Sequence, residues 1–377
     1  MRLNINPGKF GAALLLALAF SGCNHSAVKE PSITGKSRDG TVAMQAAWPM
    51  GNRLIYRVET VTSSDVPRKN TAKIIHAEFT LGQDLAFSVT NTAPDGSRIL
   101  QMEILSVQME NARDDGVTLS FDSNNKVMQV EDNELVNRLK KLVGLKLQFH
   151  LSPSNKVMRV DGAKELNNRA SGGGGPVRGL AGSVVNRHFN PQFYKEIVEM
   201  GMLPKNPVKV GDAWTVARDG GGGALPGGSG VMEVTATFRG WQRHDGTNCA
   251  RIDFSGKARP GATEQTNQSF VGRVVASAVS PNVTEGFLTG RSWFDPGLSL
   301  VVETIYDQSI TTKANPGRAT KTTRSTNDVT TGQSEALTNA PPGTNPPPPN
   351  VVNVSNATTT TRQHTSVKLL EVEPIEK

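Results

Sequence analysis

The sequence has little of what disulfide-bonded and sugar-binding proteins need. Its 377 residues include two cysteines, Cys23 and Cys249, and aromatic residues make up 5% of the chain. Two cysteines cannot supply the several bridges of a small disulfide framework. Scarce aromatic residues disfavour a carbohydrate-binding surface of stacked rings.

Recognised catalytic and cofactor-binding motifs are also missing. The sequence has no Gly-x-Ser-x-Gly elbow, His-Glu-x-x-His pair or calcium-loop spacing. Its six histidines show no ligand spacing, and His244, near Cys249, lacks a third group to orient a Cys–His pair. Gly174 and Gly179 have P-loop separation, but Leu180 replaces the phosphate-binding lysine. We therefore predict no catalytic, cofactor or metal site; a hydrolase whose residues only the fold assembles is an alternative.

The charge pattern gives no nucleic-acid footprint. The chain has 41 Lys and Arg against 34 Asp and Glu, a net charge of +7, with the basic residues scattered among acids. Nucleic-acid-binding domains gather their basic residues into a patch or stripe. We predict no nucleic-acid partner.

The first 22 residues have the layout of an export signal. Arg2 and Lys9 form a basic start, followed by an apolar stretch at 10–20 and then small residues. This stretch is well short of the roughly 20 residues of a membrane-spanning helix. We predict a signal peptide over residues 1–22.

The segment Phe20-Ser21-Gly22-Cys23 resembles the bacterial lipobox, although Phe20 departs from the usual leucine. The resemblance implies cleavage between Gly22 and Cys23 and lipid on Cys23, so that the membrane becomes a partner. Asn24 is not the aspartate that this class associates with inner-membrane retention, which favours the outer membrane. The alternative is an ordinary secretory signal with an incidental cysteine.

Composition divides the rest of the chain. Residues 23–45 are polar and predict a flexible tether. The predicted parts that follow are a β-rich unit with one helix at 46–170, a glycine hinge at 171–175, a second β-rich unit at 176–311 with a helix at about 191–200, a disordered Thr/Asn/Pro-rich loop at 312–363, and a final strand at 364–377. Because residues 367–372 are apolar, the loop is expected inside a hairpin.

Alternation of apolar and polar residues predicts antiparallel strands. Leu54, Tyr56 and Val58 alternate with Arg57 and Glu59, and the pattern recurs along both units between turn residues. Asn133 and Asn190 are suited to cap the two helices. The predicted fold is mainly β (α+β), with curved, half-barrel-like antiparallel sheets and two or three packing helices. Strand parity places Cys249 beside Arg251, which predicts a modestly exposed thiol.

A distinctive motif, Val210-Gly211-Asp212-Ala213-Trp214, follows a proline-containing stretch. It resembles an uncharacterised family of bacterial secreted lipoproteins, a domain of unknown function, with a loose likeness from Ala46 to Tyr306. The resemblance implies no activity. Physically, Gly211 permits a positive φ, Asp212 can bond backbone amides and Trp214 can hold the turn to the core. A structural role is favoured over a binding role.

These features predict a membrane-anchored envelope lipoprotein that is not an enzyme. A loose resemblance to bacterial lipoprotein carriers, which close a curved sheet over a helix, implies a hydrophobic ligand between sheet and helix. The alternative is a structural or interaction module that contacts another envelope protein, with the loop at 312–363 as its contact surface.

Overall fold

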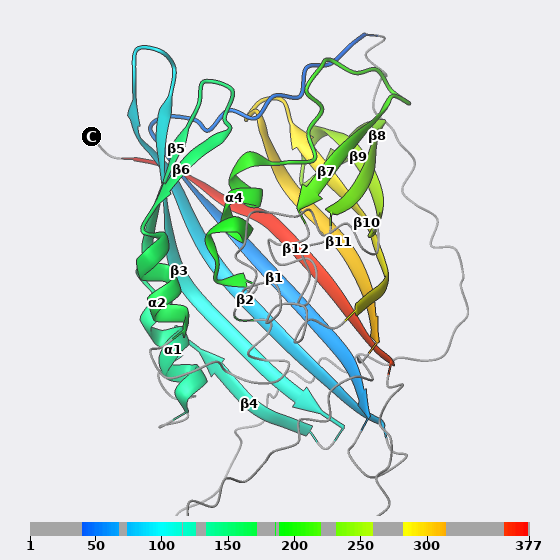
Figure 1. Ribbon diagram of the computed structural model, residues 1–377. Coiled ribbons are helices and arrows are strands. Elements are labelled where there is room, and N and C mark those ends of the chain that lie inside the picture. The colour runs from blue at the N-terminus through cyan, green and yellow to red at the C-terminus, as the bar shows by residue number, and fades with distance from the viewer. Residues whose placement is uncertain are drawn as a thin grey trace, which may run out of the picture. The chain divides into compact units, whose positions relative to one another are not determined.

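The structure is a computed structural model, shown in Figure 1. It describes residues 40–67, 74–114, 116–125, 133–171, 185, 188–219, 231–258, 282–313 and 358–375. These residues all belong to one compact unit, Thr34–Lys377. The signal peptide, Cys23, most of the tether, the Gly172–Gly175 hinge and residues 314–357 of the predicted loop lie outside the described residues.

A single open antiparallel sheet forms the framework, which confirms the mainly β fold. Its strands are β1 (Asn52–Pro67), β2 (Ile74–Thr92), β3 (Arg98–Arg113), β4 (Gly116–Asp122), β5 (Lys146–Leu151), β6 (Val157–Asp161), β7 (Ala213–Asp219), β8 (Val231–His244), β9 (Thr247–Ala258), β10 (Asn282–Asp295), β11 (Leu300–Lys313) and β12 (Thr358–Pro374). The strand order is β6-β5-β3-β2-β1-β12-β11-β10-β9-β8-β7, and β4 also pairs with β3. Every pairing is antiparallel, as alternating strands joined by turns require.

The last strand, β12, lies between the first strand and β11 (Figure 1). It pairs with β1 from Ser64↔Thr361 to Asn52↔Pro374 and with β11 from Lys313↔Thr358 to Glu303↔Lys368. A final strand in a hairpin was predicted, but its start was wrong. Residues 358–363, assigned to the loop, belong to β12 because their threonines are β-branched and pair with the threonine-rich end of β11.

Three helices lie in the described part of the chain: α1 (Glu134–Leu142), α2 (Ala163–Ser171) and α4 (Pro191–Glu199). Asn133 Oδ1 accepts a hydrogen bond of 2.9 Å from Leu135 N, and Asn190 Oδ1 accepts one of 2.9 Å from Phe193 N. These caps satisfy amides that a helix start leaves unpaired. None of the described helices combines the length and hydropathy that crossing a membrane needs.

Burial is concentrated on one face of the sheet, here called the inner face. On β1, Leu54, Tyr56 and Val58 are buried, while Arg57 and Glu59, which alternate with them, are more exposed. Since successive side chains in a strand point to opposite faces, the predicted alternation places the apolar set inward. Two clusters of buried apolar residues form the core, one around Trp48, Phe87 and the helices and one under β8 to β10.

Helix α4 lies over the inner face near the middle of the sheet (Figure 1). Two hydrogen bonds fasten it: Tyr194 Oη donates to Gln83 Oε1 on β2 at 2.8 Å, and Trp48 Nε1 donates to Val198 O at 3.1 Å. Tyr194 and Val198 are fully buried in the first core cluster. One side of α4 is thus fixed to the N-terminal half of the sheet.

A glycine in β10 is required by close packing. Gly290 lies between Phe254 on β9 and Tyr306 on β11, and an added Cβ would lie 2.6 Å from atoms of both side chains and 2.5 Å from Ile305 O. Gly82, in the middle of β2, is different, because its nearest contact would be Gln108 Cβ at 3.5 Å.

We expect Gly290→Ala to lower the free energy of unfolding by roughly 1–3 kcal/mol, because overpacking forces backbone or ring displacement. The matched Gly82→Ala change should leave stability about the same or slightly higher, since alanine restricts the unfolded chain. Urea unfolding of both variants checks this. Equal destabilisation by the two changes would contradict the packing argument.

Candidate ligand-binding cavity

A cavity of about 230 Å³ lies between α4 and the inner face of the sheet. Its floor comes from strands on both sides of β12. The floor residues are Tyr56 on β1, Val367 on β12, Val301, Thr304 and Tyr306 on β11, Ser292 on β10, Phe254 on β9 and Val216 on β7. The cavity therefore exists only when the two halves of the chain share one sheet.

The floor is mainly apolar and is held in place. Tyr56 Oη donates to Val301 O at 3.0 Å, which spans β12 and links β1 with β11. Complete burial raises the pKa of the Tyr56 phenol. Phe254 and Tyr306 approach each other over Gly290. Aromatic and aliphatic side chains of this kind line most small-molecule sites.

The wall opposite the floor is the polar side of α4. Gln192, Lys195, Glu196 and Glu199 line the cavity, together with Phe193 and Ile197. Lys195 Nζ lies 4.0 Å from Glu199 Oε1, and Glu199 Oε1 accepts a hydrogen bond of 2.8 Å from Val157 N. The Lys195 and Glu199 side chains keep 31% and 26% of their exposure, so the cavity reaches solvent beside them.

The end of the cavity is formed where α4 stops. Met200 adopts a left-handed conformation with φ 47°, and its N–H bonds Ile197 O. The chain then turns through Gly201 to Met202, and all three residues line the cavity. Methionine adapts its shape more readily than other apolar residues.

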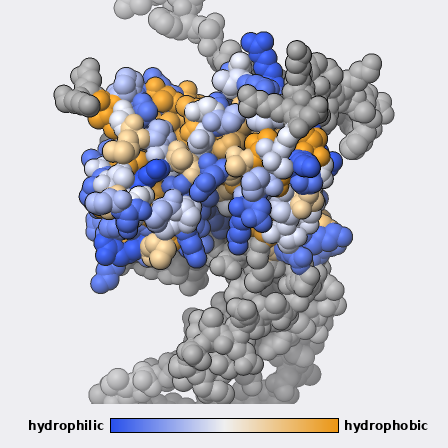
Figure 2. Space-filling model, turned by 90° about the horizontal axis from the view of Figure 1, so that it is seen from above, coloured by the Kyte–Doolittle hydropathy of each residue, from blue (hydrophilic) through white to orange (hydrophobic). Residues whose placement is uncertain are grey.

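Seen from above, the described surface is mixed. Hydrophilic residues predominate on its two flanks, while hydrophobic residues form smaller patches between and behind them (Figure 2). The exposed large hydrophobic residues are spread over several elements, such as Met158 on β6, Val210 before β7 and Leu370 on β12. The exposed hydrophobic residues therefore do not all belong to one element.

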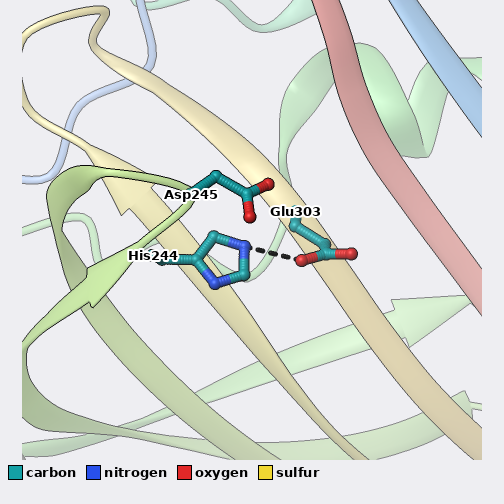
Figure 3. Close-up of side chains that lie close together, drawn as sticks. All are labelled: His244, Asp245 and Glu303. Carbon is teal, nitrogen blue, oxygen red and sulfur yellow. Dashed lines mark ion pairs between the residues drawn. The ribbon is translucent and has the colours of Figure 1, made fainter.

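A second cluster joins His244 and Asp245, at the β8–β9 turn, to Glu303 on β11 (Figure 3). His244 Nε2 lies 2.6 Å from Glu303 Oε2, and the potential ligand atoms of all three residues lie within 4.8 Å of one another. An imidazole and two carboxylates can bind Zn²⁺. This set was not found in the sequence because Glu303 is distant along the chain.

The side chain of Lys368 already pairs with one carboxylate of this cluster. Lys368 Nζ lies 2.8 Å from Asp245 Oδ2, and this hydrogen bond raises the pKa of Lys368 and lowers the pKa of Asp245. The His244 ring stacks on Trp293 with centroids 4.2 Å apart and planes 9° from parallel. These contacts fasten the β8–β9 turn to β10, β11 and β12, which favours a structural role.

The expectation of an exposed Cys249 thiol was wrong. Cys249 is completely buried, and burial raises the pKa of its thiol, with Thr247 Oγ1 as a hydrogen-bond partner at 3.4 Å. The strand alternation places Cys249 on the outer face, which was expected to be exposed. The outer face is also covered here, because its residues Arg251 and Trp293 are each only 6% exposed. His244, the base considered in the sequence, pairs with Glu303.

Three further histidines pair with carboxylates on the outside of the sheet. His76 bonds Asp65 at 2.9 Å, His150 bonds Asp161 at 2.7 Å, and His364 bonds Asp307 at 2.7 Å. The polar placement of His76 and His150 agrees with the strand patterns. His364, the first residue of the predicted final strand, lies within β12 opposite Asp307.

The Val-Gly-Asp-x-Trp motif forms the turn into β7. Gly211 has φ +92°, and Asp212 Oδ2 accepts a hydrogen bond of 2.8 Å from Lys209 N. Trp214 Nε1 donates to Met202 O at 3.0 Å and packs against the second core cluster. Trp214 therefore ties β7 to the segment that ends the cavity, while none of the three motif residues lines it.

Comparison with known proteins identifies part of the chain. Residues 95–239 match the model of the DUF6263 family. DUF6263 is described as a family of unknown function. The domain includes α1, α2, α4 and the Val-Gly-Asp-x-Trp motif, but its range is narrower than the likeness from Ala46 to Tyr306 that the sequence suggested. It supplies the helical wall of the cavity, and most of the floor lies outside it.

A solved structure titled "Lipid-protein interactions in lipovitellin" is also similar, with a TM-score of 0.44 and 7% identity. The match covers 88% of this chain and 26% of the lipovitellin chain, so this protein corresponds to about a quarter of that one. A TM-score this low supports no argument about function. No curated protein matches the sequence.

The buried tyrosines predict a loss of stability in alkali. Burial raises the pKa of Tyr56 and Tyr194 above the ordinary value of 10.0. Above about pH 10 the unfolded chain releases phenolic protons that the folded protein retains, so the free energy of unfolding falls as pH rises. Urea midpoints between pH 8 and 11 measure this slope. The Tyr56→Phe/Tyr194→Phe variant should show a shallower slope, and an unchanged one would contradict the assignment.

Proposed function

We propose that this protein is a membrane-anchored envelope lipoprotein that binds a hydrophobic ligand without transforming it. The cavity between α4 and the sheet is the observation that carries the proposal. Its apolar floor favours burial of a ligand's hydrocarbon, at roughly 25 cal/mol per Å² removed from water. The partly exposed charges of Lys195 and Glu199 provide a polar edge where the ligand meets solvent.

Anchoring rests on the N-terminal sequence. The lipobox-like segment at 20–23 supplies one cysteine for lipid, and the polar residues 24–39 give reach between membrane and sheet. Acyl chains on Cys23 would add about 0.8 kcal/mol of membrane affinity per buried methylene. The outer membrane is the proposed location, because Asn24 follows the cysteine.

Native mass spectrometry of residues 24–377, produced in a bacterial periplasm, tests ligand binding. We expect an adduct of lipid size with one ligand per chain. Ile197→Trp adds a bulky ring to the cavity wall and should reduce adduct occupancy at least tenfold. Met158→Trp is the matched control, because Met158 is 69% exposed on β6, outside the cavity. Equal occupancy in both variants would locate the ligand elsewhere, and an adduct-free wild-type protein would count against the function.

Lipid attachment is tested by Cys23→Ser in the full chain. We expect the wild-type protein in the detergent phase of a Triton X-114 partition and the variant in the aqueous phase. Intact-mass measurement should show acyl groups on the wild-type protein only. Detergent partition of the serine variant would indicate a different anchor.

A further inference from the structure

The apolar floor of the cavity contains a pair of hydroxyl groups. Ser292 Oγ on β10 and Thr304 Oγ1 on β11 lie 2.8 Å apart, and both residues line the cavity. Ser292 is 1% exposed. The two residues face each other directly across the strands, so the pair is fixed by the register of the sheet.

The two hydroxyl groups have two hydrogens to donate, but the hydrogen bond between them uses only one. Each hydroxyl has a single hydrogen to donate, and one of these joins the two oxygens. Within the described residues, the other hydrogen has no acceptor besides the partner hydroxyl. Ser292 is buried and Thr304 is partly buried, so a ligand oxygen placed here would give the remaining hydrogen an acceptor.

We infer that the cavity binds a single-chain acyl lipid whose carbonyl oxygen accepts a hydrogen bond from the Ser292–Thr304 pair. This inference rests on the proposed function and names its ligand class. The acyl chain lies on the floor formed by residues such as Phe254, Val301 and Val367. A volume of about 230 Å³ is below the roughly 300–1,000 Å³ of pockets for drug-sized ligands, which favours one chain over several.

The carbonyl can belong to a free fatty acid or to an ester. Lys195 lines the wall with part of its side chain in solvent, and its charge can attract a free carboxylate. An ester has no such charge. Dodecanoic acid and 1-dodecanoylglycerol share the chain and the carbonyl, and only binding of the acid should weaken in Lys195→Gln.

A pair of lipids isolates the contribution of the carbonyl. 1-Dodecanoylglycerol and 1-O-dodecylglycerol have the same chain and head group, and only the first has the carbonyl oxygen. Dissociation constants are measured by displacement of N-phenyl-1-naphthylamine from residues 24–377, at lipid concentrations below micelle formation. We expect the acyl lipid to bind roughly threefold to tenfold more tightly, as one net hydrogen bond allows.

Matched variants assign that preference to the hydroxyl pair. Ser292→Ala/Thr304→Val removes both hydroxyls and should abolish the preference, whereas Thr304→Ser keeps a pair and should retain it. Thr360→Val is the control, because Thr360 Oγ1 forms a similar pair with Thr311 Oγ1 at 3.4 Å but does not line the cavity. Thermal unfolding of each variant establishes that it is folded.

The outcomes separate this inference from the proposed function. A preference that disappears only in the double variant supports carbonyl recognition. Equal binding of both lipids by the wild-type protein overturns the carbonyl contact and leaves hydrophobic binding intact. If neither lipid displaces the probe from the folded protein, both the carbonyl contact and the proposed function are overturned.

Discussion

Pairing of the C-terminal strand with the first strand is the interaction on which the rest of the structure depends. β12 forms long antiparallel ladders with β1 on one side and β11 on the other. Without it, β1 to β6 and β7 to β11 would be two sheets with exposed edges, which attract unwanted pairing. Because the main chains of β1 and β11 both bond to β12, Tyr56 can reach Val301 across it and complete the cavity floor.

The cavity follows from the same constraint. α4 is fastened on one side through Tyr194 and Val198, in the N-terminal half of the chain, whereas its opposite side faces floor residues from β9 to β11. The helix therefore fills only part of the space over the sheet. Gly290 allows Phe254 and Tyr306 to close the floor, and the Ser292–Thr304 pair places a hydroxyl within it. A rigid sheet holds these groups more precisely than loops would.

The outer face of the sheet carries polar contacts between neighbouring strands. Arg57 on β1 makes two hydrogen bonds with Asp84 on β2, at 2.8 and 3.0 Å, and Asp84 also accepts one from Ser106. Cross-strand pairs of opposite charge contribute modestly to the stability of the sheet. The His244, Asp245 and Glu303 cluster does the same at the β8–β9 turn. Together these polar contacts leave the apolar surface on the inner face, where a ligand can be enclosed.

By itself the sequence determined the mainly β fold, the strand alternation, the caps at Asn133 and Asn190 and the final strand, because these depend on neighbours within a few residues. The Gly211 turn was predictable for the same reason. Only the tertiary structure decided that both halves of the chain share one sheet, that Cys249 is buried and that Ser292 meets Thr304 under α4. These features depend on which distant strands pair and on what covers each face of the sheet. The local alternation of residues gives no information about either. The physical reason is that register and burial are properties of the assembled sheet.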